Sequence, residues 1–225
     1  MKTAEGEWLQ QACFSLGILP TPNQSHQLLG YIDLLQRWNG TYNLTAIRDR
    51  AGMLTQHLAD CLAVVEPLSR HLQAAGVAGS RLLDVGSGGG LPGAVLAILL
   101  PRLMVTCVDT VGKKAAFVRQ VAGALALPNL ESVHGRVEGL QAQAFDVITS
   151  RAFASLAEFA RLTSAHLAPG AVWMAMKGKP PHDELEALPK SIDVFHVEQL
   201  KVPGLDAERC LVWMKPRSAD FGKPA

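Results

Sequence analysis

The chain has 225 residues, of which 48% are hydrophobic and 18% are charged, and its formal net charge is +1. This composition is typical of a globular domain and excludes a disordered chain. Charge alone does not point to nucleic acid, so a basic face would have to be local. No apolar run reaches the roughly 18 residues of a membrane-spanning helix, and the first residues hold no apolar signal core, so we expect a cytoplasmic protein without membrane contact. Four scattered cysteines predict neither a metal site nor a disulfide framework.

The first eighty residues have the pattern of helices. Thr21, with Pro22 next and Gln24 three residues after the cap, predicts a helix start. Asn39-Gly40 predicts the end of that helix. Its apolar face recurs at helical spacing and consists of Leu28, Ile32, Leu35 and Trp38. We interpret residues 1–78 as an N-terminal helical extension.

A second helix is expected after Asp49, which predicts its cap, and Pro67 predicts its end. Its apolar stripe consists of Leu54, Leu58, Cys61, Leu62 and Val65. His57 and Asp60 lie one turn apart on this helix. A metal or acid–base pair is one interpretation of these two residues, and structural hydrogen bonding is the favoured one.

The pattern changes at Arg81 to short apolar strands that alternate with helices. We expect strands at 82–85, 104–108, 130–134, 145–149 and 171–176, and helices at 91–100, 113–127, 155–167 and 182–188. The last two strands, 192–197 and 210–215, lie too close for a crossover helix and predict a hairpin. The pattern favours an α/β fold with a doubly wound, mostly parallel sheet, and functional residues at the carboxyl ends of its strands. We assign residues 79–217 to this domain and 218–225 to a tail.

A glycine loop follows the first of these strands. Asp84 precedes Gly86, Gly88 and Gly90, a spacing closer to the first motif of class I methyltransferases than to the G-x-G-x-x-G of dinucleotide sites. We expect all four residues to contact the cofactor. Asp109 ends the next strand, where an acid binds the ribose of a nucleotide cofactor. NAD enzymes share that acid, so Asp109 by itself does not choose the cofactor.

A short-chain dehydrogenase is the main competing interpretation of this loop. It needs a tyrosine with a lysine four residues later. Tyr31 and Tyr42 are the only tyrosines, and Leu35 and Ala46 occupy those positions. The sequence therefore argues against this class of dehydrogenase.

The fourth strand ends in Thr149-Ser150-Arg151-Ala152-Phe153. It lacks both the Asn-Pro-Pro-Tyr type of motif, which suits exocyclic amines, and the Pro-Cys pair of cytosine carbon-5 methylation. A ring nitrogen such as guanine N7 needs neither, because its lone pair attacks a methyl group directly, and catalysis is then mostly positioning. Arg151 is the strongest candidate for binding guanine O6 or a phosphate, with a surface salt bridge as the alternative. Phe153 would stack on a base, but a core role is favoured.

Basic residues gather around the expected strand ends. Lys177 follows the fifth strand on the same rim as Arg151, and we expect both to act in catalysis. A local basic face for RNA is predicted despite the neutral total. Its members are Arg151, Lys177, Lys113, Lys114 and Arg119. We expect RNA contacts from Lys113, Lys114, Arg119, Asn43 and Arg48.

Segments between about Leu28 and Lys179 resemble the bacterial 16S ribosomal RNA guanine-N7 methyltransferases, also called glucose-inhibited division protein B. YNLTAIRD and TSRAFASL are the most distinctive of them. The matching segments are RWNGTYNLTAIRD (37–49), HLADCLAV (57–64), LLDVGSGGGLPG (82–93), VDTVGKKAAFVRQV (108–121), HGRVEGL (134–140), FDVITSRAFASL (145–156) and AMKG (175–178). Two positions depart from the usual pattern: Cys61, where the family usually has Ser, and Gly89, where it often has Ala or Pro.

The resemblance implies a class I S-adenosylmethionine methyltransferase fold with a seven-stranded sheet. It implies methyl transfer from S-adenosylmethionine to N7 of the guanine at 16S rRNA position 527, in the 530 loop. It places cofactor contacts on Gly86, Leu91, Val137, Glu138 and Arg151. Arg151 thereby gains a cofactor role beside its RNA role, and the sequence does not decide between them. The implied partner is 16S rRNA or the small ribosomal subunit, with the protein as a monomer and no obligate protein partner.

Two other functions remain open at this stage. A small-molecule methyltransferase on the same fold would use the N-terminal helices as a lid and Arg151 to hold an anionic substrate. A cofactor-binding module without catalysis would act by contact with a partner.

Overall fold

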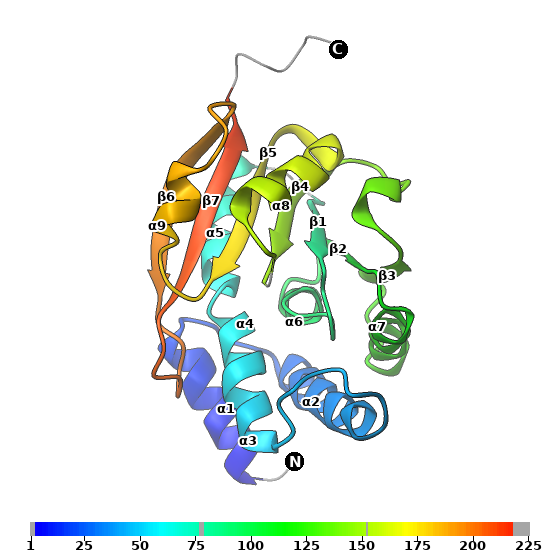
Figure 1. Cartoon of the computed structure of the whole chain (residues 1–225). Coiled ribbons are helices and arrows are strands. Elements are labelled where there is room, and N and C mark those ends of the chain that lie inside the picture. Colours follow the sequence, from blue (N-terminus) through cyan, green and yellow to red (C-terminus); the bar gives the residue numbers. More distant parts are fainter. Residues whose placement is uncertain (1–2, 77–78, 152, 218–225) are drawn as a thin grey trace.

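The computed structural model describes residues 3–76, 79–151 and 153–217, so the predicted tail, 218–225, lies outside the described residues. Within these ranges one sheet of seven strands runs in the order β3-β2-β1-β4-β5-β7-β6 (Figure 1). β1 to β5 are mutually parallel, and β7 is antiparallel to both β5 and β6. The predicted sheet and its closing hairpin are therefore confirmed. The strands are β1 (Arg81–Val85), β2 (Met104–Asp109), β3 (Leu130–His134), β4 (Phe145–Ser150), β5 (Leu167–Lys177), β6 (Ile192–Leu200) and β7 (Arg209–Pro216).

Helices cover both faces of this sheet and one of its edges (Figure 1). Among the described residues, no helix is both long and apolar enough to cross a membrane. The N-terminal helices are α1 (Thr3–Ser15), α2 (Pro22–Tyr42), α3 (Arg50–Gly52), η1 (Met53–Ala59), α4 (Asp60–Leu62) and α5 (Val65–Ala75). The later ones are α6 (Gly93–Leu99), α7 (Gly112–Ala124), η2 (Val137–Gly139), α8 (Leu156–Thr163), η3 (Ser164–His166) and α9 (His182–Glu186).

The start of α2 is as predicted, but its end is not. Thr21 and Gln24 form a reciprocal capping box. The helix continues past Asn39-Gly40 to Tyr42, because the Asn39 side chain is buried and holds the following loop. Its Nδ2 donates to the Ile47 carbonyl at 2.9 Å, and its Oδ1 accepts from the Thr45 N–H at 2.9 Å.

The second predicted helix is α3, η1 and α4, one continuous helical run over residues 50–62 with a π-helical middle. Asp49 caps it, since its Oδ1 accepts the Gly52 N–H at 2.7 Å. The prediction that Pro67 ends this helix is wrong. Pro67 lies in the first turn of α5, where a residue without an N–H costs no helical hydrogen bond.

β5 begins at Leu167, four positions before the expected strand start, because the pairing with β4 shifts register between Leu167 and Val172. Pro169-Gly170 therefore lies inside the strand. Gly170 has a φ of 80°, which allows the chain to bulge at this point.

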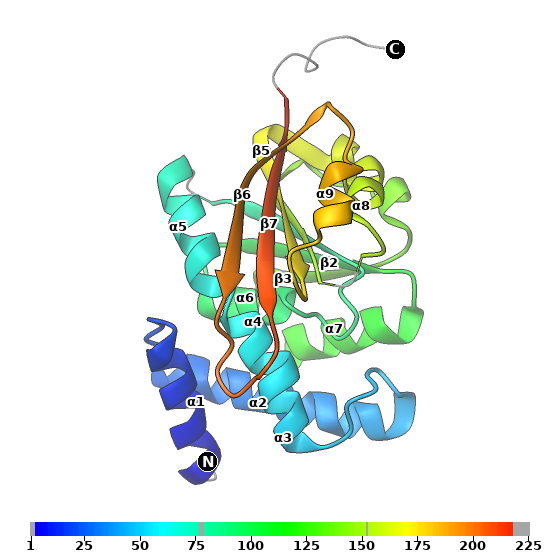
Figure 2. The same ribbon diagram turned by 60° about the vertical axis from the view of Figure 1, so that its left-hand side comes forward.

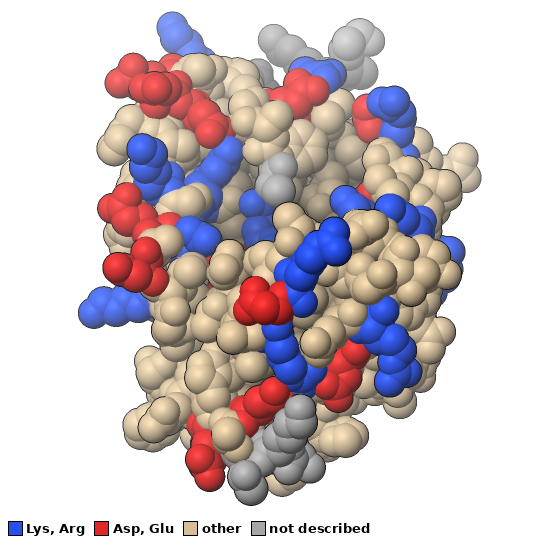
Figure 3. All heavy atoms as spheres, turned by 60° about the horizontal axis from the view of Figure 1, so that its bottom comes forward, with Lys and Arg blue, Asp and Glu red and all other residues tan. Residues whose placement is uncertain are grey.

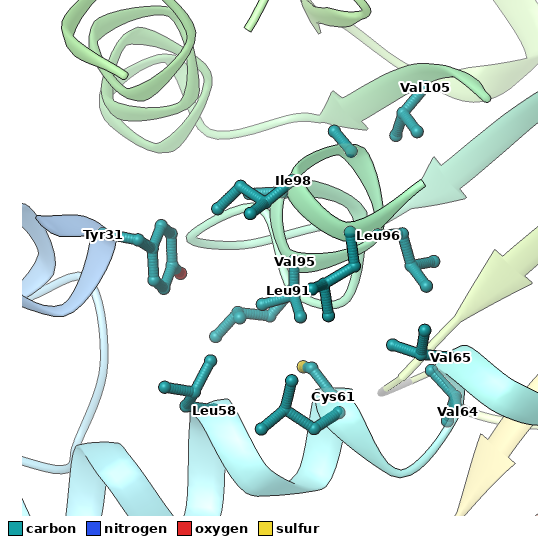
Figure 4. Packing of buried hydrophobic residues seen from close by; sticks show 14 of the residues in the cluster. Tyr31, Leu58, Cys61, Val64, Val65, Leu91, Val95, Leu96, Ile98 and Val105 are labelled. Carbon is teal, nitrogen blue, oxygen red and sulfur yellow. The ribbon is translucent and has the colours of Figure 1, made fainter. Parts of the chain in front are cut away.

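Two hydrophobic clusters lie on opposite faces of the sheet. One includes α6 and α7, and the other includes α8. The N-terminal helices belong to the first cluster: Tyr31, Leu58 and Cys61 pack against Leu91 and Val95 (Figure 4). The predicted extension and the sheet therefore share one core.

The hairpin of β6 and β7 stands beside α5 (Figure 2). Side chains join them, since the His71 and Trp213 rings lie 4.9 Å apart and Arg70 pairs with Glu198 at 2.8 Å. This edge is thereby fixed to the rest of the molecule.

Candidate functional site

The carboxyl ends of β1, β2, β4 and β5 meet at one edge of the sheet, because these strands are parallel. Figure 1 shows the N-terminal helices α1 to α4 lying beyond this edge. The glycine loop, Asp109, Arg151 and Lys177 all follow or end these strands. The predicted site residues therefore surround the space between the sheet and the helical extension.

The glycine loop takes a backbone conformation that side chains disfavour. Gly86, Gly88 and Gly90 have φ values of 65°, 59° and 78°. A Cβ on Gly86 or Gly88 would meet no atom within 4 Å, so open space lies beside the loop. Gly93 is different: a Cβ there would lie 2.9 Å from Asp84 Oδ2 and 3.2 Å from a Val105 methyl group. This glycine allows α6 to approach the sheet closely.

Asp84 lies beneath this loop and is fully buried. Its Oδ2 accepts the Gly93 N–H at 2.9 Å, which fixes the start of α6. Its Oδ1 has no hydrogen-bond partner among the described residues, and burial raises the pKa of the carboxyl to about 7. The structure gives Asp84 a positioning role under the loop, and its predicted direct contact with the cofactor stays a prediction.

Asp109 joins the loop to the end of β2. Its Oδ2 accepts the Gly88 N–H at 2.9 Å, and its Oδ1 accepts the Val111 N–H at 2.8 Å. Each carboxylate oxygen has a second lone pair, so the group retains acceptor capacity for a ribose hydroxyl. Open space beside positive-φ glycines, with a carboxylate next to it, fits a nucleoside cofactor.

The segment after β3 lies beside Asp109, because the Gly135 N–H donates to the Asp109 carbonyl at 3.1 Å. Val137 is buried, and its carbonyl oxygen lies 2.7 Å from His166 Nε2. Glu138 is exposed next to it. The structure thus brings both predicted residues to the side of the loop where Asp109 lies.

Two cavities open at this edge. The loop cavity, about 180 Å³, lies between the glycine loop and the helical extension. The outer cavity, about 320 Å³, lies between the helical run 50–62 and the ends of β5 and β7. His57 and Arg151 line both cavities. The face in Figure 3 is hollowed, with Lys and Arg side chains gathered around the hollow.

Arg151 lies at the junction of the two cavities. Its Nη1 is 3.4 Å from His57 Nδ1 and 3.6 Å from Asp60 Oδ2. The alternative of a salt bridge is thus present in the structure, but it is not at the surface, because the Asp60 side chain is only 5% exposed. A cation placed between two cavities can act on ligands in either one.

His57 and Asp60 both make structural interactions, which is the interpretation that the sequence favours. Each of them pairs with a different residue, and they do not pair with each other. His57 Nε2 lies 2.8 Å from Thr45 Oγ1. Asp60 Oδ1 accepts from Arg209 Nε at 2.8 Å. Burial, reinforced by the charge of Arg151, lowers the pKa of His57 to about 4, so the ring is neutral at pH 7. Among the described residues, no group of three or more metal-binding side chains is present.

Lys177 lines the outer cavity, but its ammonium is engaged. Its Nζ lies 2.8 Å from Glu184 Oε2 and donates to the Phe153 carbonyl at 3.5 Å. Glu184 also accepts the Leu156 N–H at 2.7 Å. These contacts fix the segment after β4, and a catalytic role for Lys177 stays a prediction. The Phe153 ring packs 5.3 Å from Phe159, which supports the core role over base stacking.

Three of the predicted RNA-binding residues come together near the loop. Lys113 Nζ donates to the Tyr42 carbonyl at 2.6 Å, and Arg48 donates to Asn43 Oδ1 at 3.0 Å. Tyr42 directly precedes Asn43 in the chain and is 45% exposed. The other two lie apart from this group. Lys114 lines the loop cavity, 4.0 Å from Asp109, and Arg119 is exposed further along α7.

Two residues at the site were missed by the sequence reasoning. Tyr31 is fully buried and its hydroxyl donates to the Gly89 carbonyl at 2.7 Å, so the helical extension holds the loop. Tyr31 lies on the apolar face of α2 between Leu28 and Leu35, a position that could have signalled this contact. Arg209 reaches Asp60 from β7, far away in sequence, and no local pattern predicts that pairing.

The sheet order, the glycine loop after β1 and the acid at the end of β2 define a class I S-adenosylmethionine-dependent methyltransferase. The solved structure of a glycopeptide N-methyltransferase, MtfA, complexed with sinefungin shares the fold. It has a TM-score of 0.55 at 13% sequence identity, and the match covers 68% of this chain and 86% of that one.

Sequence comparison identifies the family within this class. Residues 24–212 match the family described as rRNA small subunit methyltransferase G. A ribosomal RNA small subunit methyltransferase G of Methylibium petroleiphilum is 57% identical, over 94% of each chain. That of Leptothrix cholodnii is 60% identical, over 91% of this chain and 92% of its own. The chain belongs to this family, and S-adenosylmethionine is its cofactor.

Proposed function

We propose that the protein transfers a methyl group from S-adenosylmethionine to N7 of a guanine in 16S rRNA, at position 527 in the 530 loop. The observation that carries this proposal is the match of residues 24–212 to a family named for small-subunit rRNA methylation. The distinctive segments YNLTAIRD and TSRAFASL support the finer assignment to guanine N7.

The side chains around the two cavities suit this chemistry. S-adenosylmethionine supplies an electrophilic methyl group, and guanine N7 carries a lone pair, so no proton has to be removed before transfer. The His57 ring is neutral, but its Nε2 is already engaged with the Thr45 hydroxyl. The segment Ser150–Phe153 contains no acid. The protein therefore acts by orienting the two reactants and by the charge of Arg151.

Cofactor contacts are assigned to the loop and its neighbours. Gly86 and Leu91 line the loop cavity, and Arg151 reaches it from the end of β4. Asp109 would bind the ribose hydroxyls, with Val137 and Glu138 beside it for the adenine. These roles follow the family resemblance, and their common location around the loop supports them.

RNA contacts are assigned to the group of Lys113, Arg48 and Asn43 around the exposed Tyr42. The two cations would neutralise phosphates, which makes binding weaker as salt rises. Arg119 and Lys114 would add charge on the α7 side. We infer that the substrate is 16S rRNA or the small subunit, bound by a monomer in the cytoplasm.

A labelling assay tests the proposal. The protein is incubated with methyl-labelled S-adenosylmethionine and small subunits lacking the modification, and the rRNA is digested to nucleosides for mass spectrometry. Labelled 7-methylguanosine is expected. A different methylated nucleoside would refute the N7 assignment. No labelled nucleoside, with cofactor binding shown by calorimetry, would redirect the search to small molecules or to a non-catalytic role.

A further inference from the structure

The outer cavity is a candidate binding site for one nucleobase. Its volume of about 320 Å³ falls within the roughly 300 to 1,000 Å³ of small-ligand sites. It is separated from the loop cavity by the two residues common to both walls, His57 and Arg151. A base held here would therefore lie next to a cofactor bound at the loop.

Asp60 is the one carboxylate among the lining residues of this cavity. Its side chain is 5% exposed, and Arg209 holds its Oδ1 at 2.8 Å. Its Oδ2 lies 3.6 Å from Arg151 Nη1 and accepts no hydrogen bond from the described residues. One carboxylate oxygen is thus anchored, and the other is available to a ligand in the cavity.

We propose that Asp60 and Arg151 together recognise the target guanine, an inference that rests on the proposed function. Guanine presents O6 as an acceptor, followed by N1–H and the 2-amino group as donors. Arginine only donates hydrogen bonds and a carboxylate only accepts them. The pair therefore matches guanine, and it opposes adenine, which presents an amino donor followed by a ring-nitrogen acceptor.

The order of the groups also orients the base for methylation. Around the purine the order is N7, O6, N1 and the 2-amino group. Around the site the order is the loop cavity, Arg151 and Asp60, whose Oδ2 has two lone pairs and can accept from both N1–H and the 2-amino group. With O6 at Arg151 and N1 at Asp60, N7 faces the loop cavity. Reading this edge requires an unpaired base, as enzymes that extrude their target base achieve.

The test compares guanine with inosine, which lacks only the 2-amino group, at the target position of reconstituted small subunits. Loss of one hydrogen bond to a charged group predicts about a 10-fold lower kcat/KM for inosine with the wild-type protein. Equal rates on the two bases would overturn the inference. This comparison needs no variant, so a folding defect cannot obscure it.

Asp60→Asn provides the second arm. Arg209 would keep the amide oxygen on its own side, so the amide NH₂ would face the guanine donors. We expect kcat/KM on guanine to fall about 100-fold and the guanine-to-inosine ratio to approach one, with calorimetric affinity for S-adenosylmethionine unchanged. A wild-type ratio in this variant would contradict base reading by Asp60, because a merely structural role leaves the ratio intact.

Glu198→Gln is the matched control. Glu198 is also an acid of low exposure paired with an arginine, Arg70 at 2.8 Å, but it lies outside the outer cavity. Its rate and base ratio should equal those of the wild type. If the wild-type protein methylates neither substrate, the proposed function itself is refuted. Methylation of both bases at equal rates would refute the role of Asp60 but not the proposed function.

Discussion

The glycine loop and the outer cavity are adjacent, but they are built in different ways. The loop is fixed mainly by backbone hydrogen bonds to two nearby acids, Asp84 and Asp109, within one βαβ unit, and Tyr31 of the helical extension adds one contact to Gly89. The outer cavity is assembled from side chains of distant segments, with Asp60 held by Arg209. A cofactor site can thus be encoded locally and shared by a whole fold class, whereas a substrate site depends on the particular extension and hairpin around it.

Arg151 joins the two regions, so its loss should have the largest effect on turnover. Arg151→Ala should lower the rate of methyl transfer about 100-fold at saturating RNA and cofactor, comparable to removal of one preorganised charged donor. Single-turnover kinetics measures this. Arg119→Ala, an exposed arginine on α7 away from both cavities, is the control and should retain the wild-type turnover at saturation. Normal turnover by Arg151→Ala would show that Arg151 is not needed for methyl transfer, and it would contradict a role for Arg151 in both cavities.

Gly93→Ala tests whether close packing beneath the loop is required. The new Cβ would press on Asp84 and on β2, which are backbone-anchored and cannot yield cheaply, so a destabilisation of about 1–3 kcal/mol is expected. Chemical denaturation measures it. Gly123→Ala is the matched control, since a Cβ there meets no atom within 4 Å, and it should be neutral or slightly stabilising because alanine favours helices. Equal stability of both variants would show that the loop does not depend on this packing.

Asp109→Asn perturbs the cofactor side alone. The amide retains one acceptor for the Gly88 or Val111 N–H but loses the charge and one acceptor. Affinity for S-adenosylmethionine should fall about 10-fold, or about 1.4 kcal/mol, and the guanine-to-inosine ratio should stay as in the wild type. Titration calorimetry gives the first value. An unchanged affinity would remove Asp109 from the ribose site.

His57, which lines both cavities, should make the stability of the protein depend on pH. Because its folded pKa, about 4, lies below the unfolded value of about 6.5, the unfolded chain binds more protons between these pH values. The wild type should lose stability as pH falls through this window, by about 1–3 kcal/mol in total. His57→Gln should show a shallower loss in denaturation series at pH 7, 5.5 and 4. Parallel curves for the two proteins would show that His57 is not buried as a neutral ring.

The smallest effect is expected at the RNA-binding group. Lys113→Gln should reduce RNA affinity a few-fold and lower the salt slope by about one phosphate contact. Filter binding across a salt series measures both. Lys190→Gln, outside this group and both cavities, should leave the slope unchanged. A wild-type slope for Lys113→Gln would place the RNA elsewhere.

The same contrast explains what could be predicted from the sequence. The strands of the sheet, the loop, Asp109 and the position of Arg151 follow from local patterns, since strand positions and strand ends are set by short-range hydrophobic periodicity and turn residues. The end of α2 and the position of Pro67 did not follow. Asn39 resembles a helix stop, but burial and two hydrogen bonds to the next loop override that local preference.

The side-chain partners in the outer cavity could not be predicted either. Arg209 reaches Asp60 across 149 positions of the chain. Such contacts depend on how helices of the extension pack against the sheet, and no periodicity carries that information. Lys177 follows β5 at the position expected for a site residue, but its ammonium group forms a salt bridge with Glu184 on α9.

The most direct test of the central claim is the methylation state of the 530 loop in cells. Small-subunit rRNA from a strain with the gene deleted is compared with rRNA from the same strain complemented by the wild-type or the Arg151→Ala protein, using mass spectrometry of nuclease fragments. We expect the 530-loop fragment to lack one methyl group in the deletion strain and to regain it at guanine N7 with the wild-type protein. The variant should not restore it fully. Full methylation of that fragment in the deletion strain would contradict the proposed function.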